Sequence, residues 1–509
     1  MRVLIATDKF KHSLTADEVA RHLASGLVTD RPDLTVDCLS IADGGEGTVA
    51  AAISAGYTAH VATVSGPTGL PVTATMAVRD HIAVIETALA SGLGSLPGGT
   101  PNALGATSMG TGELIREALN HGCTLIYIGA GGSACTDGGA GLLVGLGAKF
   151  LDSRGQPLPP GGGALEHLAA ADLSGLHPGL RNARFVLASD VDNPLLGERG
   201  APAVFGPQKG ADPSAVELLN RALTRLVEVL EGEIGPRAKT AVTKAGAGAA
   251  GGIGYAAIAV LAARVEPGVT VVGRLVDLDK KIEGATLVIT GEGSLDEQSL
   301  GSKAPLGVSR AAARAGVPVI AVCGQTTLSD RTLKAAGFNR TFALADIEPD
   351  PAKCMSNAGP LLQTVGTTVS GHAKLPIGGQ ASARWRPRGL PDHSHQRCPQ
   401  TASRNTLGEG RIPRNHPAPP PSLERILKVG RARKPRVCLP SGMAGSHTWS
   451  ARNARLRQRD ASWLGPQMLV GDDRWLESPG IGRKHKQNNE LRYERQLHGR
   501  PCRLEGSGR

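Results

Sequence analysis

The stretch LIYIGAGGSACTDGGAGLLVGLG, residues 125–147, decides the fold that we expect for this chain. A short apolar run at 125–128 stops at Gly129, glycines then recur as far as Gly141, and an apolar run of small residues follows. This order predicts a strand, a glycine-rich loop and a helix, and in α/β proteins anionic ligands bind at such helix N-termini. A tight turn that needs glycine only for positive φ explains the spacing alone equally well.

The N-terminal part of the chain repeats the strand-to-helix order. Residues 2–7 are typical of a buried strand, and Thr15 with Glu18 forms a capping-box pattern that opens a helix. A second strand at 36–41 runs into the acidic glycine loop DGGEG at 43–47. Two strand–helix units in succession predict a parallel sheet.

The pattern changes near Ser65, where Gly-Pro and Gly-Leu-Pro turns appear. Two segments with alternating apolar residues, 72–78 and 81–86, predict an antiparallel pair. Residues 151–182 are rich in glycine and proline and predict loops. Parallel-sheet signals return with a strand at 286–290, so we expect an α/β protein of more than one domain.

The charge of the chain changes abruptly near residue 372. Residues 1–372 hold 29 Lys and Arg against 35 Asp and Glu, whereas residues 373–509 hold 27 against 10, so the net charge of +11 comes from the tail. All four tryptophans also lie in the tail. Many Pro, Gly and Arg residues with high charge are typical of disorder. Out-of-frame translation of GC-rich DNA explains this tail better than an evolved nucleic-acid-binding segment, so nucleic acid is not an expected partner.

The cysteine pattern argues against a secreted disulfide scaffold and against a zinc site. The eight cysteines are scattered, without a CxxC pair or zinc-like spacing, which favours a reduced, cytoplasmic protein. The N-terminal apolar run spans only residues 3–6, so we expect neither a signal peptide nor a membrane-spanning helix.

The loops that follow the expected strands collect carboxylates and lysines, which together suit phosphoryl transfer. Carboxylates bind Mg²⁺ or accept the proton of a hydroxyl, lysines neutralise phosphates, and glycine-rich helix N-termini cradle them. Taken singly, each aspartate is more often a helix cap or turn former, and each lysine a solvated surface group. The charged side chains are Asp8, Asp43, Glu46, Asp137, Asp190, Asp192, Glu292, Asp296, Lys9, Lys11, Lys209 and Lys303.

In order along the chain, these loops resemble those of the glycerate kinase family of the bacterial two-domain type. The matching segments are DKFKHSLTADEVA (8–20), ADGGEGT (42–48), IETALASGL (85–93), TSMGTGELI (107–115), GAGGSACTDGGAG (129–141), SDVDNPLLG (189–197), VFGPQKGA (204–211), GAGAAGGIG (246–254), VITGEGSLDEQSL (288–300) and KAPLGV (303–308). Lys9, His12 and Ser302 depart from the family pattern, which has serine, glycine and glycine at these positions.

The resemblance implies two α/β domains plus the tail. Residues 1–65 and 285–372 would form a discontinuous flavodoxin-like or Rossmann-like domain with a parallel sheet, and residues 66–284 would form an inserted α/β domain. Residues 373–509 match nothing in the family, so we expect a disordered basic tail there. The active site is expected in the cleft between the two domains.

The resemblance also implies ATP-dependent phosphorylation of D-glycerate with Mg²⁺, with 2-phosphoglycerate as the favoured product. The expected catalytic residues are Asp43, Glu46, Asp190 and Lys11. The expected contacts to substrate or phosphate are Asp8, Lys9, Ser133, Thr136, Asp137, Lys209, Gly291, Glu292 and Lys303. The expected metal ligands are Asp190, Asp192 and Asp296.

Two other functions stay open at this point. One is a kinase for another small hydroxy acid, and the other is a non-catalytic regulator that binds glycerate and uses the basic tail on nucleic acid. The many carboxylates favour catalysis, because a protein that only binds an anionic acid has little use for them. A homodimer is a further expectation.

Overall fold

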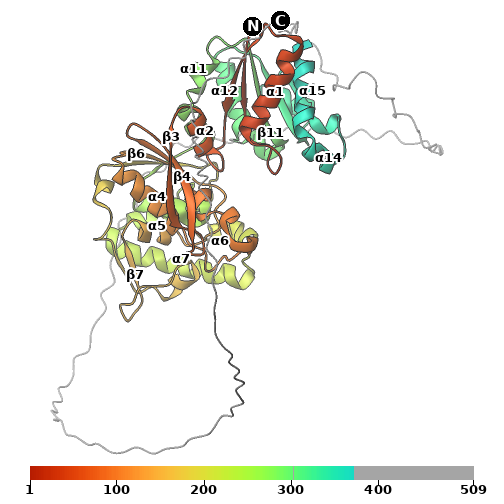
Figure 1. Cartoon of the computed structure of the whole chain (residues 1–509). Coiled ribbons are helices and arrows are strands. Elements are labelled where there is room, and N and C mark those ends of the chain that lie inside the picture. Colours follow the sequence, from red (N-terminus) through yellow and green to blue (C-terminus); the bar gives the residue numbers. More distant parts are fainter. Residues whose placement is uncertain (302, 372–509) are drawn as a thin grey trace, which may run out of the picture. The chain divides into compact units, whose positions relative to one another are not determined.

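The computed structural model describes residues 1–301 and 303–371 (Figure 1). The predicted disordered tail at 373–509 and the departure from the family pattern at Ser302 lie outside these residues. Within the described ranges, no helix is both long enough and apolar enough to span a lipid bilayer.

The first sheet is parallel throughout and has the strand order β13-β12-β11-β1-β2. In that order the strands are Arg340–Ala343, Val319–Thr326, Leu287–Leu295, Arg2–Thr7 and Thr35–Ser40. Strand β1 is paired on both sides, with β11 and with β2, so its apolar sequence is buried inside the sheet. The expected parallel sheet is confirmed, and it joins the two ends of the described chain.

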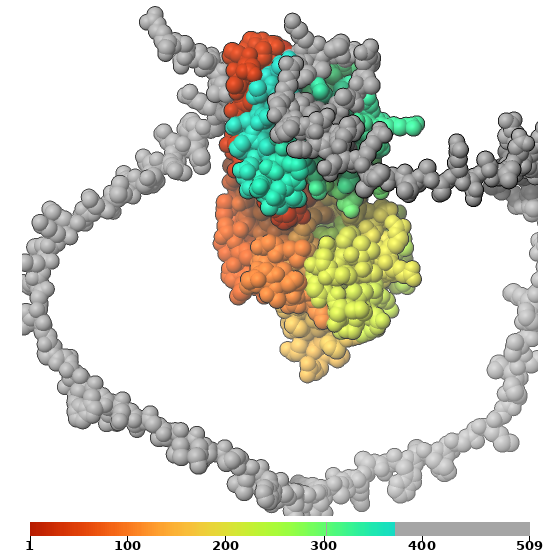
Figure 2. Space-filling model, turned by 90° about the vertical axis from the view of Figure 1, so that its right-hand side faces the viewer, coloured from red at the N-terminus to blue at the C-terminus, as the bar shows by residue number. Residues whose placement is uncertain are grey.

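Helices cover both faces of this sheet, as the alternation along β1 requires. Val3 and Ile5 pack with α1 (Ala16–Asp30) and α15 (Ala358–Gly371), which lie side by side in Figures 1 and 2. Leu4 and Ala6 point to the other face, towards α10 (Gly268–Leu275) and α12 (Ala304–Arg314). The predicted Thr15–Glu18 capping box is present at the start of α1.

Close packing of α1 and α15 depends on a glycine in each helix, Gly26 and Gly366, and a Cβ on Gly366 would lie 2.5 Å from the carbonyl oxygen of Leu23. A Cβ on Gly26 would lie 2.0 Å from the carbonyl oxygen of Gln363, so a larger residue at Gly26 would separate the two helices. The helices therefore pack at the distance that only a glycine contact allows.

The second sheet is mixed and has the order β10-β9-β6-β5-β4-β3. In that order the strands are Arg264–Glu266, Arg184–Ala188, Leu125–Gly129, Ile82–Glu86, Pro71–Arg79 and Thr58–Ser65. The predicted antiparallel pairing of β4 with β5 is confirmed, and β5, β6, β9 and β10 are parallel. Strand β3 pairs with β4, so residues 58–65 belong to the second sheet.

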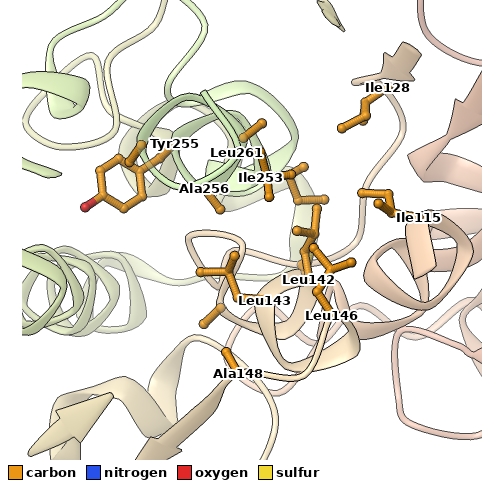
Figure 3. Close-up of a cluster of buried hydrophobic side chains, with 14 of the residues drawn as sticks. Ile115, Ile128, Leu142, Leu143, Leu146, Ala148, Ile253, Tyr255, Ala256 and Leu261 are labelled. Atoms are coloured by element: carbon orange, nitrogen blue, oxygen red, sulfur yellow. The ribbon is translucent and has the colours of Figure 1, made fainter. Parts of the chain in front are cut away.

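The core of this second part lies beneath one face of its sheet. Ile126 and Ile128 of β6 pack with α4 (Met109–Asn120), α5 (Ala140–Gly145), α7 (Pro213–Ile234) and α9 (Ala249–Ala259). Figure 3 shows part of this core, with Tyr255 at its margin and its hydroxyl turned away from Leu142 and Leu143. The glycine-rich stretch at 129–141 therefore leads directly into a packed core.

The opposite face of the second sheet packs on helices that also contact the first sheet. Val271 of α10 lies with Tyr127 and Val186, whereas Val272 of the same helix lies with Leu4. The helix α2 (Thr48–Ser54) also packs on both sheets, with Ala51 in the cluster that contains Leu4 and Val49 in the cluster that contains Tyr127. The remaining named helices and strands are α3 (Thr87–Ser91), β7 (Lys149–Leu151), β8 (Ala170–Asp172), α6 (Ala201–Phe205), α8 (Arg237–Val242), α11 (Leu278–Ile282), α13 (Asp330–Ala335) and α14 (Pro351–Ser356).

Candidate active site

A cavity of about 820 Å³ lies where the carboxyl ends of the first sheet face the loops of the second. It is lined by strand ends and loops of the first sheet, by loops and helices that follow strands of the second, and by α14 and α15. Among the predicted site residues, it brings together Asp8, Lys9, Lys11, Asp43, Glu46, Ser133, Lys209, Glu292 and Lys303. The carboxyl ends of parallel strands meet at one edge of a sheet, which is why loops distant in sequence converge here.

The two glycine-rich loops of the sequence touch backbone to backbone in this cavity. A Cβ on Gly131 would lie 2.8 Å from the Cα of Gly45, and a Cβ on Gly132 would lie 2.7 Å from Oε1 of Glu46. Glycine at these positions therefore lets the loop at 129–141 approach the acidic loop at 43–47. The loop is both tightly packed and part of the cavity wall.

Three carboxylates line the cavity at the ends of neighbouring strands: Asp8 after β1, Asp43 after β2 and Glu292 in β11. Burial raises the pKa of Asp8 to about 7; Lys9 opposes this shift, and the charges of Asp43 and Glu292 add to it. Burial also raises the pKa of Glu292. The buried Oε1 of Glu292 has no hydrogen-bond partner in the described part of the chain.

Two lysines flank these carboxylates. Lys9 Nζ donates to the backbone oxygen of Glu46 and lies 4.0 Å from its Oε2. Lys303 Nζ lies 3.9 Å from Oε2 of Glu292 and 3.8 Å from Oδ1 of Asp296. Lys11 is exposed at the cavity wall. The cavity thus pairs cations with carboxylates along the edge of the first sheet.

Lys209 supplies a third ammonium group from the second part of the chain. Its side chain is only 2% exposed, and its Nζ donates to the carbonyl of Cys135 at 2.6 Å and to Oγ of Ser133 at 3.0 Å. Burial lowers the pKa of Lys209. A buried lysine is costly unless its charge is used, so this position favours binding of an anion.

Thr136 and Asp137 are not among the residues that line the cavity, and their contact with a ligand stays a prediction. The carboxylate of Asp137 is buried and accepts hydrogen bonds from Ser108 N at 2.8 Å, from Gly139 N at 3.0 Å and from Gly141 N at 3.2 Å. The carboxylate of Asp137 therefore stabilises the glycine loop from the interior of the protein. Thr136 is also buried, and its hydroxyl lacks a partner within the described ranges. Gly291 lies inside the sheet, where a Cβ would meet Val322 O at 1.9 Å.

The structure does not assemble the predicted metal ligands. Asp190 is exposed and accepts from Gly268 N at 2.9 Å, and Asp192 pairs with Arg199 at 3.0 Å on the surface. Asp296 caps a short helix by accepting from Ser299 N at 3.2 Å. No group of three or more His, Cys, Asp or Glu side chains suited to a metal ion occurs in residues 1–301 and 303–371. Asp190 is not among the residues that line the cavity, whereas its neighbour Val191 is, and the catalytic role of Asp190 stays a prediction.

Sequence reasoning gave no role to Glu86, which holds the acidic loop in place. Glu86 ends β5, and its Oε2 accepts from Gly47 N at 3.0 Å and from Val49 N at 3.2 Å. A carboxylate of the second sheet therefore caps α2, the helix that follows the acidic loop. Its only signal in the sequence is its place in the segment IETALASGL. Burial raises the pKa of Glu86 to about 7.

The α/β fold and a cavity with lysines and glycine-rich loops at the strand ends are typical of an enzyme that binds an anionic ligand. A family model described as the glycerate kinase family matches residues 3–373. The chain belongs to the glycerate kinase family, and it is a kinase.

Curated relatives are similar over most of their own length. A glycerate kinase of Bacillus subtilis (strain 168) is 39% identical over 74% of this chain and 98% of the relative. A glycerate 2-kinase of Escherichia coli (strain K12) is 42% identical over 68% of this chain and 90% of the relative. A crystal structure provisionally assigned as glycerate kinase 2 from Salmonella typhimurium LT2 has a TM-score of 0.63 and 39% identity, covering 74% of this chain and all of that one.

Proposed function

We propose that this chain transfers the γ-phosphoryl group of ATP to the 2-hydroxyl of D-glycerate, giving 2-phosphoglycerate and ADP. The observation that carries the proposal is the single cavity in which five carboxylates, four lysines and two glycine-rich loops converge. The similarity to a relative named glycerate 2-kinase supports the position of transfer.

The glycine loop and Lys209 suit the carboxylate of the acceptor. Lys209 is held by Cys135 O and Ser133 Oγ, so its remaining N–H can bind an anion without moving. A preorganised cation in a buried site binds an anion more strongly than a mobile surface lysine does. Ser133 adds a hydroxyl to the same wall of the cavity.

We assign to Glu46 the role of general base, which accepts the proton of the attacking hydroxyl. Its side chain is 43% exposed, lines the cavity and points at the glycine loop near Gly132. In the reaction, the hydroxyl oxygen bonds to the γ-phosphorus, the bond to the β-phosphate oxygen breaks, and the hydroxyl proton passes to Glu46.

Mg²⁺ would enter with the phosphates of ATP, because Asp8, Asp43 and Glu292 line the same cavity but do not form, among the described residues, a group of three that holds the ion on its own. Burial raises the pKa of Asp8 to about 7 and the charges of Asp43 and Glu292 add to this shift, so a cation close to the three carboxylates would be favoured. When bound, Mg²⁺ would neutralise phosphate charge. Lys9 and Lys303 add positive charge on either side of these carboxylates.

The product identifies both the substrate and the position of transfer. The full chain, supplied with ATP, Mg²⁺ and D-glycerate, should give a phosphomonoester whose ³¹P signal is coupled to the single proton on C2. Coupling to the two protons on C3 would contradict transfer to the 2-hydroxyl. Turnover with another small hydroxy acid but not with D-glycerate would contradict the choice of substrate.

A further inference from the structure

The chemistry of the cavity wall changes along the edge of the first sheet. The charged residues follow β2, β1 and β11, where Asp43, Asp8 and Glu292 lie. The ends of β12 and β13 instead contribute Gly324, Gln325, Leu344 and Ala345. From β1 to β13 there are three strand spacings, about 14 Å at roughly 4.8 Å each. An extended nucleotide could reach across this span from its terminal phosphate to its base.

Apolar residues close the cavity at the β13 end. Leu344 and Ala345 follow β13, and Pro349 and Pro351 lead into α14. This helix crosses back towards the loop after β1, where Ser13 Oγ donates to Met355 O at 2.7 Å. Met355 lines the cavity and is 51% exposed, so its side chain is accessible to a ligand in the cavity.

Polar groups of the kind that orient a base or a ribose accompany these apolar walls. The side-chain amide of Gln325 is exposed in the cavity and makes no hydrogen bond to the rest of the described chain. Glu348 accepts from Asp350 N at 3.1 Å through Oε1, and its side chain also reaches the cavity. A mostly apolar pocket with a few polar groups is the usual environment of a flat heterocycle.

Glycines keep the middle of the cavity free of side chains. A Cβ on Gly324 would lie 2.6 Å from Gly293 O, and one on Gly293 would lie 3.3 Å from Lys11 N. The ends of β11 and β12 therefore present backbone between the apolar end and the carboxylates, where a chain of phosphates can approach closely.

We propose that the nucleoside of ATP binds at the β12–β13 end of the cavity, against Leu344, Ala345 and α14, with its phosphates directed along the strand ends towards Glu292 and Asp8. This assignment rests on the proposed kinase function and adds the direction in which the nucleotide lies. D-Glycerate then binds at the opposite end, beside Glu46, Ser133 and Lys209.

The test fills the proposed nucleoside pocket. Ala345→Phe in the full chain should raise the KM for ATP by roughly 10-fold or more, because a ring then occupies the space of the base, and should leave the KM for D-glycerate within about 2-fold. Ala313→Phe, at an exposed position of α12, is the matched control and should change neither KM.

A second variant tests the same pocket independently, in case Ala345→Phe does not fold. Met355→Ala removes an exposed side chain, so the fold is retained, and we expect weaker binding of ADP by calorimetry in the absence of glycerate. Two results together would overturn the placement of the nucleoside without refuting the kinase function. The first is that Ala345→Phe leaves the KM for ATP unchanged or raises both KM values equally. The second is that Met355→Ala binds ADP as the wild-type chain does. A wild-type chain that consumes no ATP with D-glycerate would instead refute the proposed function.

Discussion

Lys209 shows how a single residue connects packing to chemistry. Its ammonium is buried at the inner wall of the cavity and is held by an oxygen of Cys135 and by Ser133. The backbone around it is as constrained: a Cβ on Gly251 would lie 1.9 Å from Cys135 O and 2.9 Å from Lys209 Nζ. A charge placed so rigidly can bind an anion without the entropic cost of ordering a long side chain.

Lys209→Met should therefore lower kcat/KM for D-glycerate by on the order of 100-fold, because the substrate loses a fixed cation while the volume of the side chain is kept. The oxygens of Ser133 and Cys135 lose a donor, which should cost about 1–3 kcal/mol of stability. Steady-state kinetics and thermal melts measure the two effects. Lys239→Met, which removes an exposed pair with Glu231, is the control. Equal activity in both variants would show that Lys209 only packs.

Glu46→Gln tests the assigned proton acceptor. The amide keeps the size of the side chain but cannot take a proton, so kcat should fall by about 100-fold or more while the KM for ATP changes little. Loss of ATP binding with unchanged kcat would show instead that Glu46 positions the nucleotide.

At the scale of residues, the sequence predicted the types of side chain in the site more accurately than the particular residues that line the cavity. Asp137 and Asp190 both follow strands as Asp8 and Asp43 do, yet Asp137 turns into the protein to bind Ser108, and Asp190 turns towards Gly268. The direction of a side chain depends on tertiary contacts that spacing does not contain. His12 has φ of 65°, a left-handed conformation, which accounts physically for the family's glycine there.

At the scale of elements, the acidic loop is held by a strand of the other sheet. Glu86 at the end of β5 accepts two N–H groups at the start of α2, and Lys9 Nζ donates to Glu46 O from the other side. The loop that carries Asp43 and Glu46 is therefore fixed by residues from both sheets. A local fit of this kind positions catalytic groups to within fractions of an ångström.

Glu86→Ala should lower kcat by on the order of 10-fold or more, because the acidic loop loses its cap, and should cost about 1–3 kcal/mol of stability. Glu113→Ala is the matched control, since Glu113 also accepts a backbone N–H, from Ser65 at 2.6 Å, but does not line the cavity. Both variants should melt earlier. Retained kcat in Glu86→Ala would contradict the positioning role.

The pH dependence of stability gives a second test of Glu86. Its folded pKa is raised from 4.5 to about 7 by burial, so between these values the folded chain binds the proton more tightly than the unfolded chain. The contribution of Glu86 to stability is therefore fully present at low pH and falls as pH rises through this window, by on the order of 3 kcal/mol at most. Glu86→Gln cannot ionise, so its melting temperature relative to wild type should rise between about pH 5 and about pH 8. A constant difference would place the pKa near its ordinary value.

Elements with strong local signals were predictable, and those that depend on pairing were less so. The capping box at Thr15 and the buried strand at 2–7 are local features, and both are present. Strand β3 was missed because its exposed edge residues, such as Val61, give no period that separates it from a loop. The short β8 in the glycine-rich segment exists through its pairing with β7.

At the scale of the whole molecule, the two ends of the described chain meet in one sheet. Strands β1 and β2 pair with β11, β12 and β13, and the second sheet lies between them in sequence. The division into 1–65 with 285–372 and 66–284 stays a prediction, as does the homodimer. The cavity shows why such a chain arrangement matters, since neither sheet alone supplies both the acidic loop and Lys209.

The most direct test of the central claim is ATP consumption by the full chain, followed in a coupled assay with and without D-glycerate. The account predicts turnover that requires D-glycerate and Mg²⁺, that is lost in Glu46→Gln and Lys209→Met, and that persists when residues 373–509 are removed. ATP consumption that is independent of D-glycerate, or absent from the wild-type chain, would contradict it.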